Sequence, residues 1–254
     1  MRIYLVRHGL SESNIDKTVH HKVADHAISL SAEGKEQATA AGRFLVKHFY
    51  DKGLIQRVQD LNLRLFDARL WVSPYKRTRQ TADGIEYAFR KAWLAPKVPM
   101  DQPVPPGPWE KEPIFQHGRR EHINLVEQQF GLFDGYEDEE RAERYPKEFD
   151  HFKKCVDQEG EFWARMPLGE SRFDVAVRVH QAFGTFKRDE EKHGIQNLIV
   201  VSHGTTLRAF TMQWLHLPFE WFEKEANYNN CSIRLIEDDV DRGFIFEGFP
   251  KKKT

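Results

Sequence analysis

The sequence contains few cysteines, no long hydrophobic run and no excess of positive charge. Its two cysteines, Cys155 and Cys231, lie far apart and follow no metal-ligand spacing. They could form one disulfide, but no feature of the sequence requires it, so we expect reduced thiols and a cytoplasmic location. The formal net charge of −1 gives no overall positive field for nucleic acid or an anionic membrane, and neither is expected as a partner. Cations that attract an anionic substrate must therefore be placed locally.

No segment is long enough to cross a membrane or to form the core of a signal peptide. The first apolar run covers only residues 3–6 and ends at a charged residue. No internal repeat or low-complexity block is present. A share of 40% hydrophobic and 30% charged residues is typical of a soluble globular protein. We therefore expect residues 1–254 to form a single domain, and the sequence leaves open whether it assembles as a homo-oligomer.

Hydrophobic periodicity predicts strands that alternate with helices. Strands are expected at 3–6, 68–72, 198–201, 232–236 and 244–246, and helices at 32–49, 75–93, 137–157, 171–192 and 205–215. This alternation predicts an α/β protein, built as a three-layer α/β/α sandwich with a mainly parallel central sheet.

Residues 94–116 contain seven of the twelve prolines and show no periodicity. Loops of this length in compact domains are usually functional lids or else disordered. We therefore interpret residues from about 94 to 167 as an inserted loop and helical region that covers the active site as a lid.

Two histidines stand where a predicted aliphatic strand ends, and a glycine follows each of them. They are His8 and His203. Ligands of open α/β sheets bind at such strand ends. The helix expected from Thr205 onward begins there, and its free amides favour an anion. Arg7 and Arg77 can add guanidinium groups, whose planar fork matches phosphate oxygens. The pattern favours a phosphate site.

Four blocks, in this order, resemble the histidine phosphatase superfamily, which includes the cofactor-dependent phosphoglycerate mutases. They are LVRHGLSESN at 5–14, SPYKRTRQTA at 73–82, EQQFG at 127–131 and VSHG at 201–204. Leu10 stands where the family commonly has a polar residue. Gly169-Glu170-Ser171, with Asp174 and Arg178 after it, is similar to the phosphatase branch.

The resemblance implies a metal-free phosphomonoester hydrolase of the histidine acid phosphatase type, without a cofactor, acting on a small phosphorylated metabolite. His8 would be the nucleophile that carries the phosphoryl group, and Glu127 would be the general acid and base. Arg7, Arg77 and His203 would complete the catalytic set. The residues expected to bind the phosphate are Arg7, Asn14, Arg77, His203, Gly204 and Thr205.

Two alternatives are a phosphoglycerate mutase and a catalytically silent phosphate-binding regulatory protein. A mutase must also hold a carboxylate, and in the mutases arginine and tyrosine follow the acid. Here Gln128, Gln129 and Phe130 follow it, which favours the phosphatase. A silent protein is expected to lack the nucleophile or a pocket arginine, and none is missing. Glu121 is the nearest competitor for the role of Glu127.

Two further groups of charged residues have no assigned role. His20, His21 and His26 share a polar loop with Asp25, and a surface position is the simpler interpretation than a metal site. His117, Arg119, Arg120 and His122 could contact a second anionic group of the substrate, but a solvated basic patch is favoured.

Overall fold

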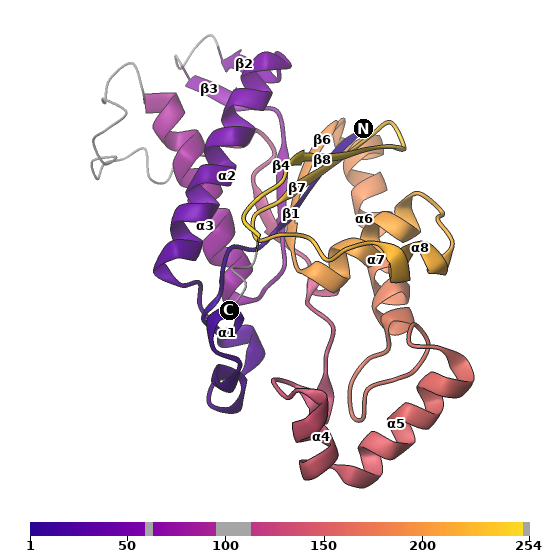
Figure 1. The fold of residues 1–254 in the computed structure, drawn as a ribbon. Coiled ribbons are helices and arrows are strands. Elements are labelled where there is room, and N and C mark those ends of the chain that lie inside the picture. The colour runs from indigo at the N-terminus through magenta and orange to yellow at the C-terminus, as the bar shows by residue number, and fades with distance from the viewer. Residues whose placement is uncertain (59–62, 95–112, 251–254) are drawn as a thin grey trace.

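A six-stranded sheet forms the middle layer of the molecule in the computed structural model, which describes residues 1–58, 63–94 and 113–250 (Figure 1). The strand order is β5-β4-β6-β1-β7-β8. Their bounds are β1 Arg2–Arg7, β4 Arg69–Val72, β5 Arg119–Glu121, β6 Asn197–Ser202, β7 Ile233–Glu237 and β8 Val240–Phe246. The first four strands of this order are parallel, β7 pairs antiparallel with β1, and β8 pairs antiparallel with β7. The predicted sheet is confirmed.

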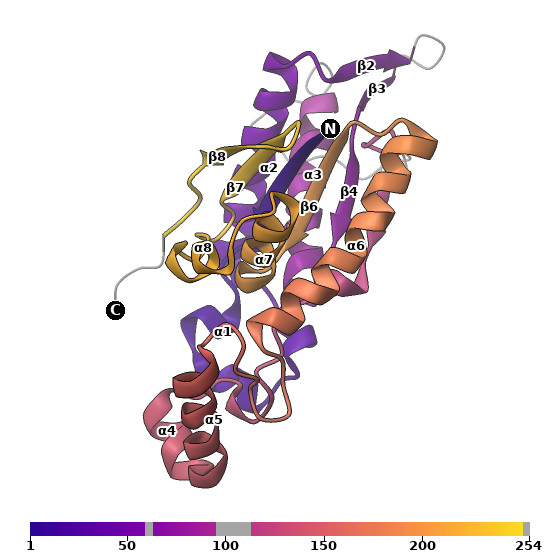
Figure 2. The same ribbon diagram turned by 90° about the vertical axis from the view of Figure 1, so that its right-hand side faces the viewer.

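Helices cover both faces of this sheet (Figures 1 and 2). One face carries α2 (Ala32–Asp51) and α3 (Lys76–Leu94), and the other carries α6 (Arg172–His193) and α7 (Gly204–Trp214). Ser31 caps α2 and Ser171 caps α6, each by accepting a hydrogen bond from a first-turn amide. The predicted three-layer α/β/α sandwich is confirmed.

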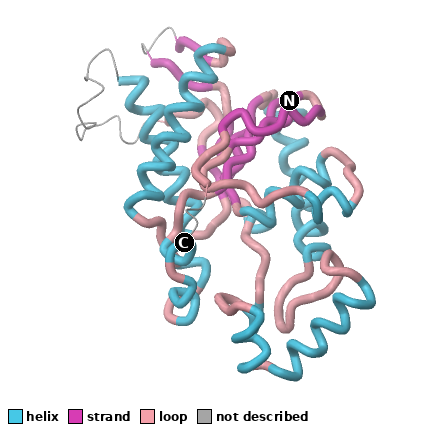
Figure 3. Tube along the Cα trace, viewed as in Figure 1, coloured by secondary structure: helices cyan, strands magenta, loops and turns pink. Residues whose placement is uncertain are grey.

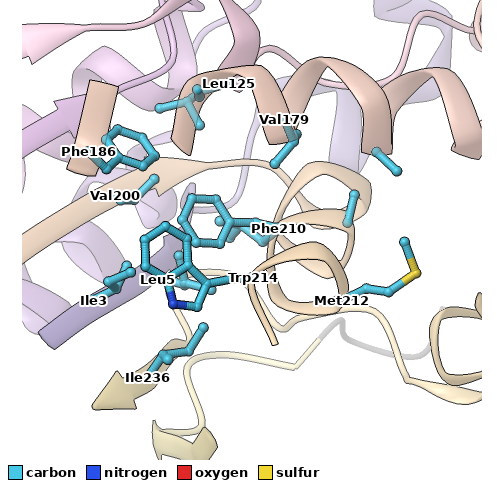
Figure 4. Packing of buried hydrophobic residues seen from close by; sticks show 14 of the residues in the cluster. Ile3, Leu5, Leu125, Val179, Phe186, Val200, Phe210, Met212, Trp214 and Ile236 are labelled. Atoms are coloured by element: carbon cyan, nitrogen blue, oxygen red, sulfur yellow. The ribbon is translucent and has the colours of Figure 1, made fainter. Parts of the chain in front are cut away.

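The central strands read as continuous apolar runs because both of their faces are buried. In β1, Ile3 and Leu5 pack into the core under α6 and α7, and Tyr4 and Val6 pack into the core under α2 and α3. Figure 4 shows the first of these cores, where Phe210 and other side chains of the two helices meet the strands. The alternation fixes the register of β1, since a slip of one residue would exchange the two cores.

Several elements differ from the sequence prediction. The charged helix expected at 137–157 is two helices, α4 (Asp138–Arg144) and α5 (Pro146–Glu159), because Pro146 begins a new helix and cannot continue the old one. The hairpin of β2 (Ile55–Val58) and β3 (Leu63–Phe66) was not predicted. Nor were the edge strand β5 and the short helix α8 (Phe219–Lys224), which carry too few residues for a periodic signal.

Only part of the predicted inserted region can be described, because residues 95–112 of the proline-rich segment lie outside the described residues. Ile114 and Phe115 are buried in the core of α2 and α3, so the segment that follows belongs to the sandwich. Helices α4 and α5 instead project from it, beyond the carboxyl ends of the strands (Figure 3). Among the described residues, no helix is both long and apolar enough to cross a membrane.

Candidate active site

Three parallel strands end side by side and bring distant residues to one edge of the sheet. Arg7 at the end of β1 is in register with Ser202 at the end of β6, and the His8 amide donates to the Ser202 carbonyl at 3.0 Å. The Ser73 amide, just after β4, donates to the Val201 carbonyl at 3.0 Å. This hydrogen-bonded frame holds the residues after all three strands together, as sequence reasoning predicted.

The His8 imidazole has a defined tautomer. Its Nδ1 lies 2.7 Å from the Gly9 carbonyl oxygen, which can only accept, so Nδ1 carries the proton. The lone pair is then on Nε2. Burial lowers the pKa of His8 well below its ordinary value, and the positive charges of Arg77 and Arg7 lower it further. His8 is therefore neutral near pH 7, which is the form that can act as a nucleophile.

His203 packs edge to face against His8 and does not line the cavity. The two ring centroids are 5.2 Å apart. Its Nε2 lies 2.9 Å from the Ser73 hydroxyl, whereas its Nδ1 is buried without a partner among the described residues. Burial, followed by the charge of Arg77, lowers the pKa of His203 well below its ordinary value. The ring is thus a neutral support for His8.

Arg7 and Arg77 are both buried and both line the cavity. Arg7 donates from Nη1 to the Tyr228 carbonyl, and its buried Nε has no partner among the described residues. Burial lowers the pKa of Arg7. Arg77 donates from Nη1 and Nη2 to the two carboxylate oxygens of Asp25, at 2.8 and 3.2 Å. A carboxylate of the protein therefore binds the guanidinium that the sequence assigned to phosphate.

The cavity next to these groups measures about 290 Å³ and is partly open to solvent. Residues from the loop after β1 and from the α4 region form most of its wall. The lining residues are Arg7, His8, Ser11, Ser13, Asn14, Lys17, His20, Asp25, Arg77, Glu127, Phe130, Phe133, Asp134, Gly135, Tyr136, Glu137, Arg141, Thr205 and Asn227. A small phosphomonoester is of the right size for this volume.

Glu127 lines the same cavity and sits on the amino terminus of α7. Its carboxylate accepts hydrogen bonds from the amides of Thr205 and Thr206 at 3.4 and 3.3 Å, and from the Thr206 hydroxyl at 3.2 Å. The free amides that the sequence suggested for phosphate thus hold the carboxylate of Glu127.

The loop that carries Glu127 is fixed by backbone contacts. Arg178 of α6 donates to the carbonyls of Asn124, Val126 and Glu127, at 2.8 to 3.0 Å, and forms an ion pair with Glu170. The Glu170 carboxylate accepts a hydrogen bond from the Gln129 amide, and the Glu170 amide donates to the Gln129 carbonyl. The Gly-Glu-Ser segment and Arg178 therefore act together as a clamp on this loop.

The remaining predicted phosphate ligands occupy different positions. Asn14 lines the cavity, and its Oδ1 accepts from the Ser11 amide and the Asn230 amide group, both at 3.3 Å, so its Nδ2 is the end that can donate to a ligand. Thr205 lines the cavity as well. Gly204 does not, because the Asn227 side chain occupies the space where a Cβ would be, 2.2 Å from its Oδ1.

The glycines after the two histidines thus serve protein packing rather than the close approach of a ligand. A Cβ at Gly9 would lie 2.5 Å from the Gly34 carbonyl oxygen at the start of α2. Protein atoms therefore fill the space beside both glycines.

Glu121 and the basic residues between 117 and 122 lie outside the cavity. Glu121 is exposed and paired with Arg79 at 2.7 Å, so it does not compete with Glu127. Arg119 is paired with Asp83 and Glu86 on the surface of α3. Among the described residues, no cluster of three or more His, Cys, Asp or Glu side chains is arranged to hold a metal ion.

Sequence reasoning missed part of the cavity wall. Asp25 and His20 were interpreted as surface residues, yet both line the cavity. Lys17, Arg141 and Asn227 were not considered at all. The loop after β1 is rich in charged and polar residues directly beyond the nucleophile, and this position was the available signal. Of the three residues after Glu127, only Phe130 lines the cavity.

The chain is similar to known proteins in sequence and in fold. The model of the histidine phosphatase superfamily (branch 1) matches residues 3–95 and 118–246. The phosphoglycerate mutase-like protein AT74H of Arabidopsis thaliana is 32% identical, over 96% of this chain and 76% of the relative. The broad-range acid phosphatase DET1 of Saccharomyces cerevisiae is 26% identical, over 98% of this chain and 89% of that protein. The solved structure of the alpha-ribazole phosphatase from Shigella flexneri has a TM-score of 0.60 at 18% identity and covers 100% of both chains.

Proposed function

The chain belongs to the histidine phosphatase superfamily, and on this premise we propose that it hydrolyses phosphomonoesters through a phosphohistidine on His8. Its substrate is a small phosphorylated metabolite. The observation that carries the proposal is the state of His8, whose Nδ1 proton is held by the Gly9 carbonyl and whose neutral ring lines a cavity with two guanidinium groups. The named acid phosphatase among the relatives supports hydrolysis as the outcome.

In the first step, the Nε2 lone pair of His8 attacks phosphorus. A P–N bond forms, the P–O bond to the substrate breaks, and the leaving alkoxide takes a proton from Glu127. Arg7 and Arg77 stabilise the charge on the equatorial oxygens, and the transfer of Arg77 from Asp25 to phosphate accompanies binding. His203 keeps the His8 ring in place through their edge contact.

In the second step, a water molecule attacks the phosphohistidine. Glu127, now a carboxylate, takes a proton from this water, the P–N bond breaks, and inorganic phosphate leaves. Glu127 is suited to both steps because it lines the cavity and because the α7 amides fix its orientation. Neither step requires a metal ion.

The test is hydrolysis of p-nitrophenyl phosphate by the wild-type chain and by His8→Ala. We expect the variant to lose activity by about 10³-fold or more, since the nucleophile is gone. His193→Ala, an exposed histidine on α6, is the matched control and should keep its activity. A chelator should leave the wild-type rate unchanged. Brief exposure to ³²P-labelled substrate, followed by denaturation, should leave an acid-labile label on the wild type and none on His8→Ala.

The same assays separate the alternatives. A mutase would interconvert phosphoglycerates faster than it releases inorganic phosphate. A silent phosphate-binding protein would bind inorganic phosphate but acquire no label and release no nitrophenol. Activity that survives in His8→Ala would contradict the proposed mechanism.

A further inference from the structure

The part of the cavity wall that would face the substrate's non-phosphate portion comes from two loops. We call Lys17, Asp134, Tyr136, Glu137 and Arg141 the outer wall. The loops touch across the cavity, since Lys17 forms an ion pair with Glu137 and His21 stacks on Tyr136 at 4.2 Å. His20 also approaches Asp134, at 3.2 Å. Contacts between the two segments therefore hold the side chains of the outer wall together.

The cations of the outer wall are already compensated. Lys17 is paired with Glu137, and Arg141 donates to Asp138 at 2.8 Å while its guanidinium lies over the Phe133 ring. The Nε of Arg141 is buried without a partner among the described residues. Among the described residues that line the cavity, no cation outside the His8 site stands without a carboxylate beside it.

The outer wall also presents acceptors. Asp134 and Glu137 are two carboxylates that line the cavity. Glu137 is paired with Lys17, whereas Asp134 lies 3.2 Å from His20. Asp25 adds a third carboxylate, and Arg77 compensates its charge only until a phosphate engages that guanidinium. Once the transferred phosphate is bound, this half of the cavity is neutral to negative. A second anionic group there would gain no net attraction.

We infer that the enzyme selects phosphomonoesters whose remaining part is neutral and bears hydroxyl groups, and that it discriminates against substrates with a carboxylate or a second phosphate. The inference rests on the proposed function and concerns the same cavity. Hydroxyl groups donate to Asp134 and Glu137 and accept from Lys17, so three of the five outer-wall residues can bond a hydroxyl group. The Tyr136 ring is stacked on His21 and lies under the Arg144 guanidinium, so it helps to hold this wall in place.

A matched pair of substrates tests this selection. Glycerol 3-phosphate and 3-phosphoglycerate differ chiefly in one group, a CH₂OH in the first and a carboxylate in the second. We expect kcat/KM for glycerol 3-phosphate to exceed that for 3-phosphoglycerate by about tenfold or more, because the carboxylate meets uncompensated negative charge. p-Nitrophenyl phosphate, with neither group, reports phosphoryl transfer by itself.

A double variant then removes the two outer-wall carboxylates. In Asp134→Asn/Glu137→Gln, we expect the preference for glycerol 3-phosphate to fall by about threefold or more, since the repulsion of a carboxylate is relieved. The control is Glu139→Gln/Glu143→Gln, which removes two exposed carboxylates from α4 that do not line the cavity. It should leave the preference unchanged.

Each outcome is decisive. A wild-type preference for 3-phosphoglycerate, or a ratio that is the same in the wild type and the cavity double variant, overturns the inference while hydrolysis of p-nitrophenyl phosphate leaves the proposed function intact. An equal change in both double variants overturns it too, because the effect would then be one of overall charge. No hydrolysis of any of the three substrates would overturn the proposed function, and this inference with it.

Discussion

At the scale of single residues, the ion pair of Arg77 with Asp25 affects the affinity of the site for phosphate. Both carboxylate oxygens of Asp25 accept from Arg77, so a phosphate must compete with Asp25 for the same guanidinium. We expect Asp25→Asn to bind inorganic phosphate about fivefold more tightly, because the amide competes less well for the cation. The measurement is the inhibition constant of phosphate against p-nitrophenyl phosphate.

The control for this prediction is Asp16→Asn, in the same loop. Asp16 is exposed and caps a short helix, and it does not line the cavity. Weaker phosphate inhibition in Asp25→Asn would show instead that Asp25 mainly orients Arg77 for binding.

The two buried histidines should make the fold sensitive to mild acid. His8 and His203 have lowered pKa values in the folded chain, whereas in the unfolded chain their pKa is about 6.5. As the pH falls below that value, the unfolded chain binds protons that the folded chain does not, and stability decreases. Each histidine contributes a loss of up to about 1.4 kcal/mol per pH unit.

The measurement is the urea midpoint between pH 7.5 and pH 5.5. We expect it to fall in the wild type and to fall less steeply in His203→Gln, which has no titrating group at that position. Because His48 and His122 also have lowered pKa values, some slope will remain. The same slope in both proteins would mean that His203 accepts a proton within the fold.

At the scale of secondary-structure elements, the sequence was informative where burial was one-sided or complete. The continuous apolar run of β6 and the apolar stripe of α2, which repeats every three or four residues, predicted both elements close to their bounds. The three residues of β5 alternate no apolar side chains, since Arg119 and Arg120 stand among them. This strand forms because β4 offers it a free edge, and that is a tertiary cause which a local pattern cannot show.

In the candidate site, too, local sequence patterns predicted some residues, whereas long-range contacts could not be predicted. His8 and Arg77 were found because each lies in a motif next to a strand end, and Glu127 was found because its segment resembles a block of the family. Asp25 was not, because its role depends on a contact with Arg77, 52 positions further along the chain. The hydrogen bonds of Glu127 to α7 join segments that are 78 and 79 positions apart. Motifs identify the residues that do chemistry, and long-range packing determines which neighbours assist them.

Arg178 allows a test of how one helix positions Glu127. Removal of its donors in Arg178→Met frees the carbonyls of the loop that carries Glu127. We expect kcat for glycerol 3-phosphate to fall by about 10²-fold, because its alkoxide must be protonated as it leaves. The kcat for p-nitrophenyl phosphate should fall only severalfold, because nitrophenolate leaves without a proton. An equal loss for both substrates would point to a purely structural role.

At the scale of the whole molecule, the chain has cores of very different extent. Two large cores fill the two faces of the sheet and hold the strand ends that carry His8 and His203. A third, much smaller one lies under α4 and α5 and contains Phe133, Phe152 and Ala164. The α4 side of the outer wall rests on this third core, since the Arg141 guanidinium lies over the Phe133 ring. The catalytic side and the selective side of the cavity therefore rest on separate packing.

This separation predicts local rather than global loosening when the small core is damaged. Phe152→Ala removes a buried ring, a change that costs about 3–5 kcal/mol in a packed core, and α4 and α5 have few other apolar contacts to compensate for it. We expect faster hydrogen exchange across residues 134–159 with unchanged protection of β1 and β6. KM for glycerol 3-phosphate should rise, while kcat for p-nitrophenyl phosphate should stay close to the wild-type value.

Phe186→Ala provides the comparison, because Phe186 of α6 lies in one of the large cores (Figure 4). That variant should lower the protection of the central strands and the urea midpoint together. If Phe152→Ala did the same, α4 and α5 would be part of one cooperative unit with the sheet. The outer wall would then be as rigid as the phosphate site, and substrate selection would depend on a fixed surface. If instead only residues 134–159 open, the outer wall moves independently of the nucleophile. The cavity can then accommodate substrates with different hydroxylated groups while the same site binds their phosphate.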